Sequence, residues 1–160
     1  MAEVFLLLGG NVGDKHKIFA ETRIMIDNCI GNLTKRSSIY ATEPWGFKSE
    51  LFWNQVLVIE TSLLPLDILD ITQSIEKSMG RIKTTDIYES RTMDIDLLFY
   101  DGLLLDTPRL TLPHPKIAER KFVLVPMNEI VPEKRHPQTG QTIGEMLKVC
   151  KDPLKVDKLC

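Results

Sequence analysis

The sequence predicts an α+β fold whose elements follow one another in the order β-α-β-β-α-β. Three segments, residues 4–8, 52–61 and 92–100, have the length and the Val, Ile, Leu and Phe content of strands. Two segments between them, residues 14–31 and 65–80, repeat apolar residues at helical spacing. A length of 160 residues suits one domain, so we expect a single folding unit over residues 1–160.

The chain should begin with a buried strand that leads into a helix. Residues Val4–Leu8 are all apolar, and Gly9-Gly10-Asn11 has the composition of a turn that stops a strand. Asp14 can cap the following helix because its carboxylate can accept a bond from an open backbone N–H, and Gly31 suits a left-handed residue after its end. The apolar stripe expected on this helix is Ile18, Thr22, Met25 and Cys29.

Two further strands and a second helix should follow. Leu33–Thr42 and Phe52–Thr61 are expected to pair antiparallel, because Glu43-Pro44-Trp45-Gly46 between them breaks regular structure. Pro65 suits the first turn of a helix, where its missing N–H would be unpaired in any residue, and Gly80 suits the end. The apolar stripe expected on this helix is Ile68, Leu69, Thr72, Ile75 and Met79.

A strand over Thr92–Tyr100, after a polar loop over Arg81–Arg91, should complete this core. The resulting order of elements is the ferredoxin-like plan. Alternation should place Met93, Ile95, Leu97 and Phe99 on one face of this strand and Thr92, Asp94, Asp96 and Leu98 on the other.

The final third of the chain should add C-terminal strands and helices to the ferredoxin-like core. A short helix is expected near Lys116–Arg120, before the apolar segment Phe122–Val125. Thr142 and Glu145 have the spacing of a capping box and predict the start of a last helix.

The composition, with 43% hydrophobic and 26% charged residues, is that of an ordinary globular protein. A formal net charge of −2 gives no general attraction for nucleic acid or anionic lipid. The apolar run near the N-terminus is too short for a signal-peptide core or a membrane span. We therefore expect a cytoplasmic protein with no nucleic-acid or membrane partner, whose anionic substrates meet a local cluster of basic side chains.

Asp94 and Asp96 are the first candidates for chemistry. They lie two residues apart on a predicted strand, so both carboxylates should leave the same face. Like charges held this closely favour a bound cation, and carboxylate oxygens suit Mg²⁺ together with phosphate oxygens and water. A solvent-exposed strand face without a metal would show the same spacing.

Basic residues on either side of this pair favour a phosphoryl-transfer site. Arg81, Lys83 and Arg91 precede the aspartates, and Arg109 and Arg120 follow them. Guanidinium groups bind phosphate oxygens bidentately, and a metal neutralises charge that develops during transfer. Any one of these arginines, taken singly, would more often be a solvated surface charge.

Aromatic residues and one amide are candidates for binding a flat heterocycle. Trp45, Phe52 and Phe122 lie in or next to predicted loops, and Asn54 could read the edge of a ring by hydrogen bonds. Core packing is the alternative role for these aromatics. Gly9–Gly13 lacks the Gly-Lys-Ser/Thr ending and the Gly-x-Gly-x-x-Gly spacing, so we interpret it as a structural turn and not a phosphate loop.

Several segments in order resemble the 6-hydroxymethyl-7,8-dihydropterin pyrophosphokinase family, and together they cover nearly the whole chain. The most specific is Arg91-Thr92-Met93-Asp94-Ile95-Asp96-Leu97-Leu98, which resembles the family signature. The others are Leu8-Gly9-Gly10-Asn11-Val12-Gly13-Asp14, Phe52-x-Asn54, Gln73-x-x-Glu76-x-x-x-Gly80-Arg81, Arg109-Leu110-Thr111-Leu112-Pro113-His114-Pro115 and Arg120-x-Phe122-Val123-Leu124-x-Pro126.

The resemblance implies a ferredoxin-like α+β fold, usually active as a monomer, with ATP as co-substrate and two Mg²⁺ ions bound by Asp94 and Asp96. It implies catalytic roles for Arg81 and Arg91. The pterin-binding residues that it implies are Phe52 and Phe122 as a sandwich, with Asn54, Thr42, Pro44, Trp45 and Gly46. The ATP-binding residues that it implies are Gln73, Glu76, Lys83, Arg91, Leu97, Arg109, Thr111, His114 and Arg120.

Two departures from the family pattern lie in the polar loop. Tyr88-Glu89-Ser90-Arg91 stands where the family often has Trp-Gly-Pro-Arg, and Lys83 stands where arginine is frequent. Lysine is a point charge without the guanidinium fork, so we expect a weaker hold on the nucleotide there.

The expected reaction moves the diphosphate of ATP to the hydroxymethyl group of the pterin, with AMP leaving, as a step of folate synthesis. Asp96 and a water molecule on the metal are both candidates for accepting the hydroxyl proton. One alternative function is a metal-dependent phosphohydrolase or nuclease, and another is a non-catalytic ferredoxin-like module that binds RNA. The slightly acidic balance and the lack of a basic aromatic strand disfavour the RNA-binding module.

Overall fold

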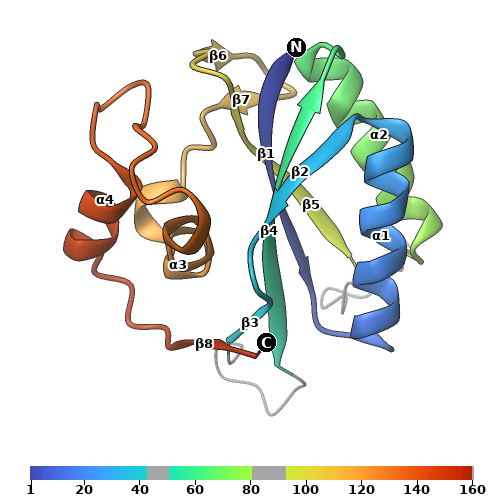
Figure 1. Cartoon of the computed structure of the whole chain (residues 1–160), viewed down its shortest axis with the longest axis horizontal. Coiled ribbons are helices and arrows are strands. Elements are labelled where there is room, and N and C mark those ends of the chain that lie inside the picture. Colours follow the sequence, from blue (N-terminus) through green and yellow to red (C-terminus); the bar gives the residue numbers. More distant parts are fainter. Residues whose placement is uncertain (43–50, 81–92, 160) are drawn as a thin grey trace.

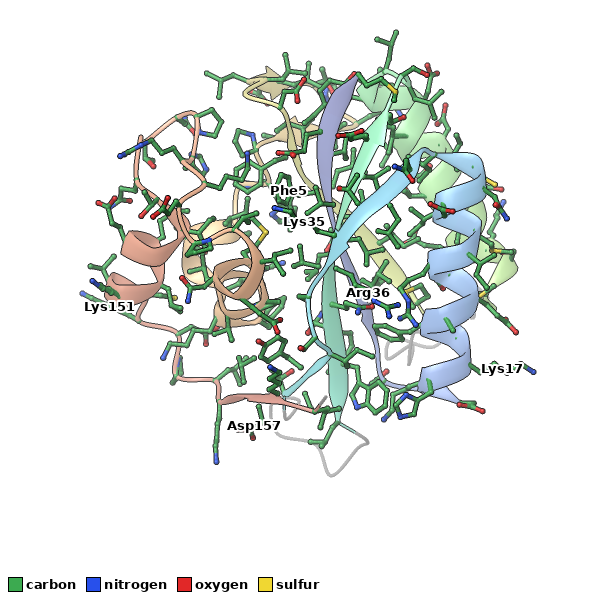
Figure 2. The ribbon with its side chains drawn as sticks, viewed as in Figure 1. Phe5, Lys17, Lys35, Arg36, Lys151 and Asp157 are labelled. Atoms are coloured by element: carbon green, nitrogen blue, oxygen red, sulfur yellow. The ribbon has the colours of Figure 1, made fainter. Side chains whose placement is uncertain are left out.

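The computed structural model describes residues 1–42, 51–80 and 93–159. Within these ranges, helices cover both faces of an antiparallel sheet (Figure 1). Helices α1 (Lys15–Cys29) and α2 (Pro65–Ser78) lie on one face, and α3 (Lys121–Ile130) and α4 (Ile143–Val149) lie on the other. Apolar side chains fill the space between the sheet and the helices on each face (Figure 2). The predicted combination of α and β structure is therefore confirmed.

Strand β1 (Ala2–Gly10) lies between β4 (Phe52–Thr61) and β5 (Asp94–Tyr100) in the sheet order β5-β1-β4-β3-β8. The predicted bounds of β4 are confirmed. The turn predicted at Gly9 is wrong, because the strand continues through this residue. A Cβ at Gly9 would come within 2.9 Å of the Asn54 Nδ2 atom, so the glycine permits close packing inside the sheet.

Helix α1 (Lys15–Cys29) begins as predicted, because the Asp14 side chain accepts a hydrogen bond from the Lys17 backbone N–H. The left-handed conformation predicted for Gly31 is wrong, because the φ angle of Gly31 is not positive. A Cβ at Gly31 would lie only 2.1 Å from the backbone oxygen of Glu60. This glycine therefore allows the chain to pass close to β4.

The buried face of α1 is displaced from the predicted stripe, whereas that of α2 (Pro65–Ser78) is confirmed. In α1, Phe19 and Ile26 are fully buried and Cys29 is exposed, because Ile30 takes the inward position after the last turn. Pro65 begins α2 as predicted. The buried residues of α2 are Ile68, Thr72, Ile75 and, unexpectedly, Glu76.

The strand predicted over Leu33–Thr42 is divided into β2 (Asn32–Arg36) and β3 (Tyr40–Thr42), both antiparallel to β4. Ser37 lies at the break and its Oγ atom accepts a hydrogen bond from the Val56 backbone N–H at 2.9 Å. Serine side chains compete with regular backbone pairing in this way, which explains the interruption.

Strand β5 contains a bulge that changes the predicted faces. Pairing with β1 shifts register at Leu98, which has no opposite residue. Phe99 consequently joins Leu98 in the core beneath α3 and α4. The sequence predicts it on the face of Leu97, which lies in the core beneath α1 and α2. Asp94 and Asp96 precede the bulge and keep the predicted common face.

The last third adds a small hairpin, helices and a C-terminal strand. The apolar segment Phe122–Val125 forms part of a helix, and the capping box of Thr142 and Glu145 is confirmed in both directions. No helix in the described ranges is long and apolar enough to cross a membrane. The elements are β6 (Leu105–Asp106), β7 (Thr111–Leu112), the 3-10 helix η1 (Ile117–Glu119), α3 (Lys121–Ile130), α4 (Ile143–Val149) and β8 (Val156–Lys158).

Candidate functional site

One row of side chains crosses three neighbouring strands of the sheet. Asn54 on β4 lies opposite Gly9 on β1, and Gly9 lies opposite Asp94 on β5. Asp96 lies opposite Leu7, whose side chain belongs to the core beneath α3. Because opposite residues of a ladder share a face, the amide and both carboxylates are on the α3 side of the sheet.

Phe52 and Asn54 meet at Gly9. An added Cβ at Gly9 would come within 2.9 Å of both Asn54 Nδ2 and Phe52 Cε1. The Asn54 Nδ2 atom donates to the Leu8 carbonyl at 3.2 Å, and only 2% of Asn54 is exposed. This bond fixes the orientation of the amide. Sequence reasoning missed the role of Gly9, although a glycine in a strand is a signal of close approach.

Thr42 and Phe122 come from two other elements on the same side of the sheet. Thr42 ends β3 and lies opposite Phe52. Phe122 is half-buried in the first turn of α3, on the same side of the sheet, and the Arg120 guanidinium carbon lies 5.5 Å from its ring centroid. A residue expected at the pterin and one expected at the phosphates are therefore neighbours.

Glu76 positions the backbone between the two aspartates. Its side chain on α2 is 6% exposed, and Oε2 accepts a hydrogen bond from the Ile95 backbone N–H at 2.9 Å. One edge of β5 pairs with β1, and the Ile95 N–H is on the opposite edge of β5. The Glu76 carboxylate therefore supplies the acceptor that this backbone donor needs. The Leu97 side chain is buried in the core with α1 and α2, so a nucleotide could contact only its backbone.

His114 lies beside the carboxylate end of this group. Its backbone N–H donates to the Leu98 carbonyl at 2.9 Å, and its Nδ1 accepts from the Lys116 backbone N–H at 3.1 Å. Burial lowers the pKa of His114; the charge of Asp96 opposes this, and the charges of Arg120 and Lys116 add to it. The ring is therefore neutral near pH 7 and close to Asp96 and Arg120.

Arg109 links the β6-β7 hairpin to α2, and Thr111 makes a contact within the hairpin. Arg109 forms an ion pair with Asp70 on α2, one turn before Gln73, which is exposed. Thr111 Oγ1 lies 3.5 Å from Asp106 Oδ1. Both partners of the Arg109–Asp70 ion pair are about half exposed, so the pair contributes little to stability and could exchange Asp70 for a phosphate.

Asn11 is a further residue that sequence reasoning did not assign to the site. It follows β1 directly, two residues after Gly9, and its buried Oδ1 atom has no hydrogen-bond partner among the residues that the structure describes. Buried polar atoms are nearly always paired in folded proteins, so this oxygen can accept a bond from a ligand.

The structure thus brings together predicted residues from β3, β4, β5, α2, α3 and the segment between β7 and α3. In the part of the chain that is described, no group of three or more His, Cys, Asp and Glu residues could hold a metal. Asp94 and Asp96 offer a pair of carboxylates, a donor set that suits an ion sharing its other ligands with water and phosphate. The predicted residues that lie outside the described ranges are Pro44, Trp45, Gly46, Arg81, Lys83 and Arg91.

Comparison with known proteins places this chain in a family. The model of the 7,8-dihydro-6-hydroxymethylpterin-pyrophosphokinase (HPPK) family matches residues 5–132. A Porphyromonas gingivalis protein named 2-amino-4-hydroxy-6-hydroxymethyldihydropteridine pyrophosphokinase is 40% identical over 136 residues, which cover 82% of this chain and 92% of that protein. A Bacillus subtilis protein of the same name is 33% identical over 157 residues, which cover 96% of this chain and 93% of that protein.

A solved structure supports the same fold. Plasmodium falciparum HPPK-DHPS with pteroate matches 92% of this chain with a TM-score of 0.75 and 16% sequence identity. This chain spans 42% of that longer chain, and at this identity the likeness concerns the fold alone. The sequence matches lead to one conclusion: the chain belongs to the 7,8-dihydro-6-hydroxymethylpterin-pyrophosphokinase family.

Proposed function

We propose that this protein transfers the diphosphate of ATP to 6-hydroxymethyl-7,8-dihydropterin and releases AMP, a step of folate synthesis. The observation that carries the proposal is the row of Asn54, Gly9 and Asp94, because it sets an amide that can read a ring edge beside carboxylates that can hold a metal. Membership of the family, whose relatives are named for this pyrophosphokinase, supports it.

The pterin would bind between Phe52 and Phe122, with its edge at Asn54. The two aromatic side chains come from β4 and from the first turn of α3, on one side of the sheet. Stacking on two rings uses both faces of a flat heterocycle, and the Asn54 amide selects its orientation. Thr42, Pro44, Trp45 and Gly46 are proposed to complete this pocket.

The phosphates of ATP would lie along β5. Asp94 and Asp96 would hold two Mg²⁺ ions, which when bound neutralise charge on the phosphate oxygens. Glu76 keeps the backbone between the aspartates in place, and His114 lies within the influence of the charges of both Asp96 and Arg120. The remaining nucleotide contacts are proposed for Gln73, Lys83, Arg91, Leu97, Arg109 and Thr111.

In the reaction, the hydroxymethyl oxygen of the pterin would attack the β-phosphorus of ATP. The new O–P bond forms while the bond from the β-phosphorus to the oxygen of the α-phosphate breaks. AMP leaves with that oxygen, and the hydroxyl proton passes to Asp96 or to water. Arg81 and Arg91 are proposed to stabilise the transferring group with their guanidinium charges. Holding the pterin and the phosphates of ATP on neighbouring strands gives the orientation on which such a transfer depends.

We propose in addition that the fold follows the ferredoxin-like plan and that residues 1–160 form a single pyrophosphokinase domain, active as a cytoplasmic monomer. The succession of β1, α1, β2, β4, α2 and β5 supports this plan, with β1 and β4 inside the sheet. The cytoplasm supplies the ATP that the proposed reaction consumes.

The function can be tested by mixing the purified protein with ATP, Mg²⁺ and 6-hydroxymethyl-7,8-dihydropterin and separating AMP, ADP and phosphate by chromatography. AMP formed only in the presence of the pterin is the expected result. ADP or free phosphate would instead indicate a kinase or a phosphohydrolase, and the absence of nucleotide turnover would contradict an enzymatic role.

Replacing Phe122 by alanine is expected to weaken pterin binding by about 1 to 3 kcal/mol, the scale of a lost stacking or burial contact. Titration calorimetry should show this loss, while ATP affinity of the same variant stays within about twofold of wild type. Unchanged pterin affinity would remove Phe122 from the pocket.

A further inference from the structure

A carboxylate outside the proposed chemistry joins three elements near the pterin-binding residues. Glu129, on α3, accepts hydrogen bonds from the Ser38 backbone N–H at 2.7 Å and from the Ser38 hydroxyl at 2.6 Å. Its Oε2 atom lies 3.4 Å from the Lys158 Nζ atom on β8, and it is hydrogen-bonded to the Tyr40 side chain on β3. One side chain thus fastens α3 to both β3 and β8.

The charge on Glu129 makes these bonds strong. Burial alone would raise the pKa of Glu129, but hydrogen bonds from Ser38 and Tyr40 and the charge of Lys158 lower it overall. Burial, with the charge and hydrogen bond of Glu129, raises the pKa of Tyr40 to about 12. Near pH 7 the carboxylate is therefore ionised and the phenol is neutral, which is the arrangement of a charge-assisted hydrogen bond.

The strand that Glu129 fastens supports the pterin-binding residues of β4. On one edge of β3, Tyr40 lies opposite Asn54 and Thr42 lies opposite Phe52. On the other edge, β3 pairs antiparallel with β8 near the C-terminus, and Thr42 lies opposite Val156 (Figure 1). Figure 2 labels Asp157, the middle residue of β8, which lies opposite Ala41 of β3. β8 therefore covers the outer edge of the strand that ends at Thr42.

The helix that Glu129 fastens carries the other ring. Phe122 lies seven residues before Glu129 on α3, so the two residues are on the same side of the helix, two turns apart. Phe52 lies on the strand paired with β3. The bonds of Glu129 consequently hold the helix of Phe122 against the strands that support Phe52.

We propose that Glu129 is a positioning residue that sets the spacing between Phe52 and Phe122, and with it the affinity for the pterin. Glu129 acts here through α3 and β3 and does not touch substrate. This role rests on the proposed function, because only a flat ligand between the two rings would be sensitive to their spacing.

The test is the variant Glu129→Gln, which keeps the size of the side chain and removes its charge. The KM for the pterin is expected to rise about tenfold, whereas kcat and the KM for ATP stay within about twofold. Glu133→Gln is the matched control, because Glu133 is an exposed glutamate just beyond the same helix, and this variant should match wild type. Tyr40→Phe, which removes one hydroxyl only, should raise the pterin KM by about threefold.

Hydrogen exchange separates this role from the proposed function. Residues 40–42 and 156–158 should exchange faster in Glu129→Gln than in wild type, whether or not the protein is active. If wild type forms no pterin-dependent AMP, the proposed function fails, and pterin affinity measured by calorimetry on the same variants replaces KM. An unchanged pterin affinity would overturn the positioning role. Equal losses of pterin affinity, ATP affinity and Tm would also overturn it, since they describe general destabilisation.

Discussion

Replacing Asp96 by alanine is expected to lower kcat by about a thousandfold, the scale seen when a group that stabilises transition-state charge is removed. Asp96 lies on the α3 face of β5, half-buried, in the strand segment that precedes the bulge. Its carboxylate is proposed to hold a metal and not to fill the core, so the variant should fold. The circular dichroism spectrum of the variant should accordingly match that of wild type.

AMP release in the presence of ATP, Mg²⁺ and the pterin measures this loss, with circular dichroism as the check on folding. Asp94→Ala should behave in the same way. Asp67→Asn is the matched control, because Asp67 is an exposed carboxylate in the first turn of α2. This variant should leave turnover unchanged. Turnover of Asp96→Ala within about tenfold of wild type would contradict a metal-binding role.

The parts of the fold that sequence predicts well are those with local signals. β4 has the predicted bounds because an apolar segment ends at recognisable turns, and α2 begins at Pro65 because proline suits the first helical turn. Asp14 caps α1 for a similarly local reason. Such features depend on residues within a few positions of one another, which the sequence displays directly.

The parts that sequence predicts badly depend on distant partners. Gly31 is a glycine because the backbone of Glu60 passes close to it, and no pattern around Gly31 reveals that neighbour. Phe99 lies on the unexpected face because the register of β5 shifts against β1 at Leu98. A period of two predicts faces only until a bulge intervenes.

The candidate site shows the same division. The common face of Asp94 and Asp96 follows from their spacing alone, and the structure places both carboxylates as that spacing predicts. The closeness of Asn54 to Asp94 depends on the register of β4 and β5 against β1, and the burial of Glu76 depends on a backbone donor at the edge of β5. Sequence reasoning could name these residues, by resemblance, but could not place them together.

Replacing Gly9 by alanine is expected to weaken pterin binding about a hundredfold, because it disturbs a stacking contact and a hydrogen bond together. The new methyl group would lie 2.9 Å from Asn54 Nδ2 and 2.9 Å from Phe52 Cε1, distances that real Cβ contacts do not tolerate. Both side chains must move, and both are proposed to touch the pterin. Gly9 also lies opposite Asp94, but the three atoms nearest the added Cβ all belong to Asn54 and Phe52, so ATP affinity should stay within about twofold.

Calorimetry with the pterin and with ATP, on the same preparation, distinguishes a local effect from loss of the fold. Gly102→Ala is the matched control, because a Cβ at Gly102 would meet nothing within 4 Å and should change neither affinity. If Gly9→Ala lowered both affinities and Tm together, the substitution would have disrupted β1 itself. Phe52→Ala would then be the deciding variant, and it should lose pterin affinity while ATP binding stays intact. A pterin affinity equal to that of wild type in Gly9→Ala would mean that Phe52 and Asn54 do not bind the pterin, because the added methyl group cannot fit while both side chains stay in place.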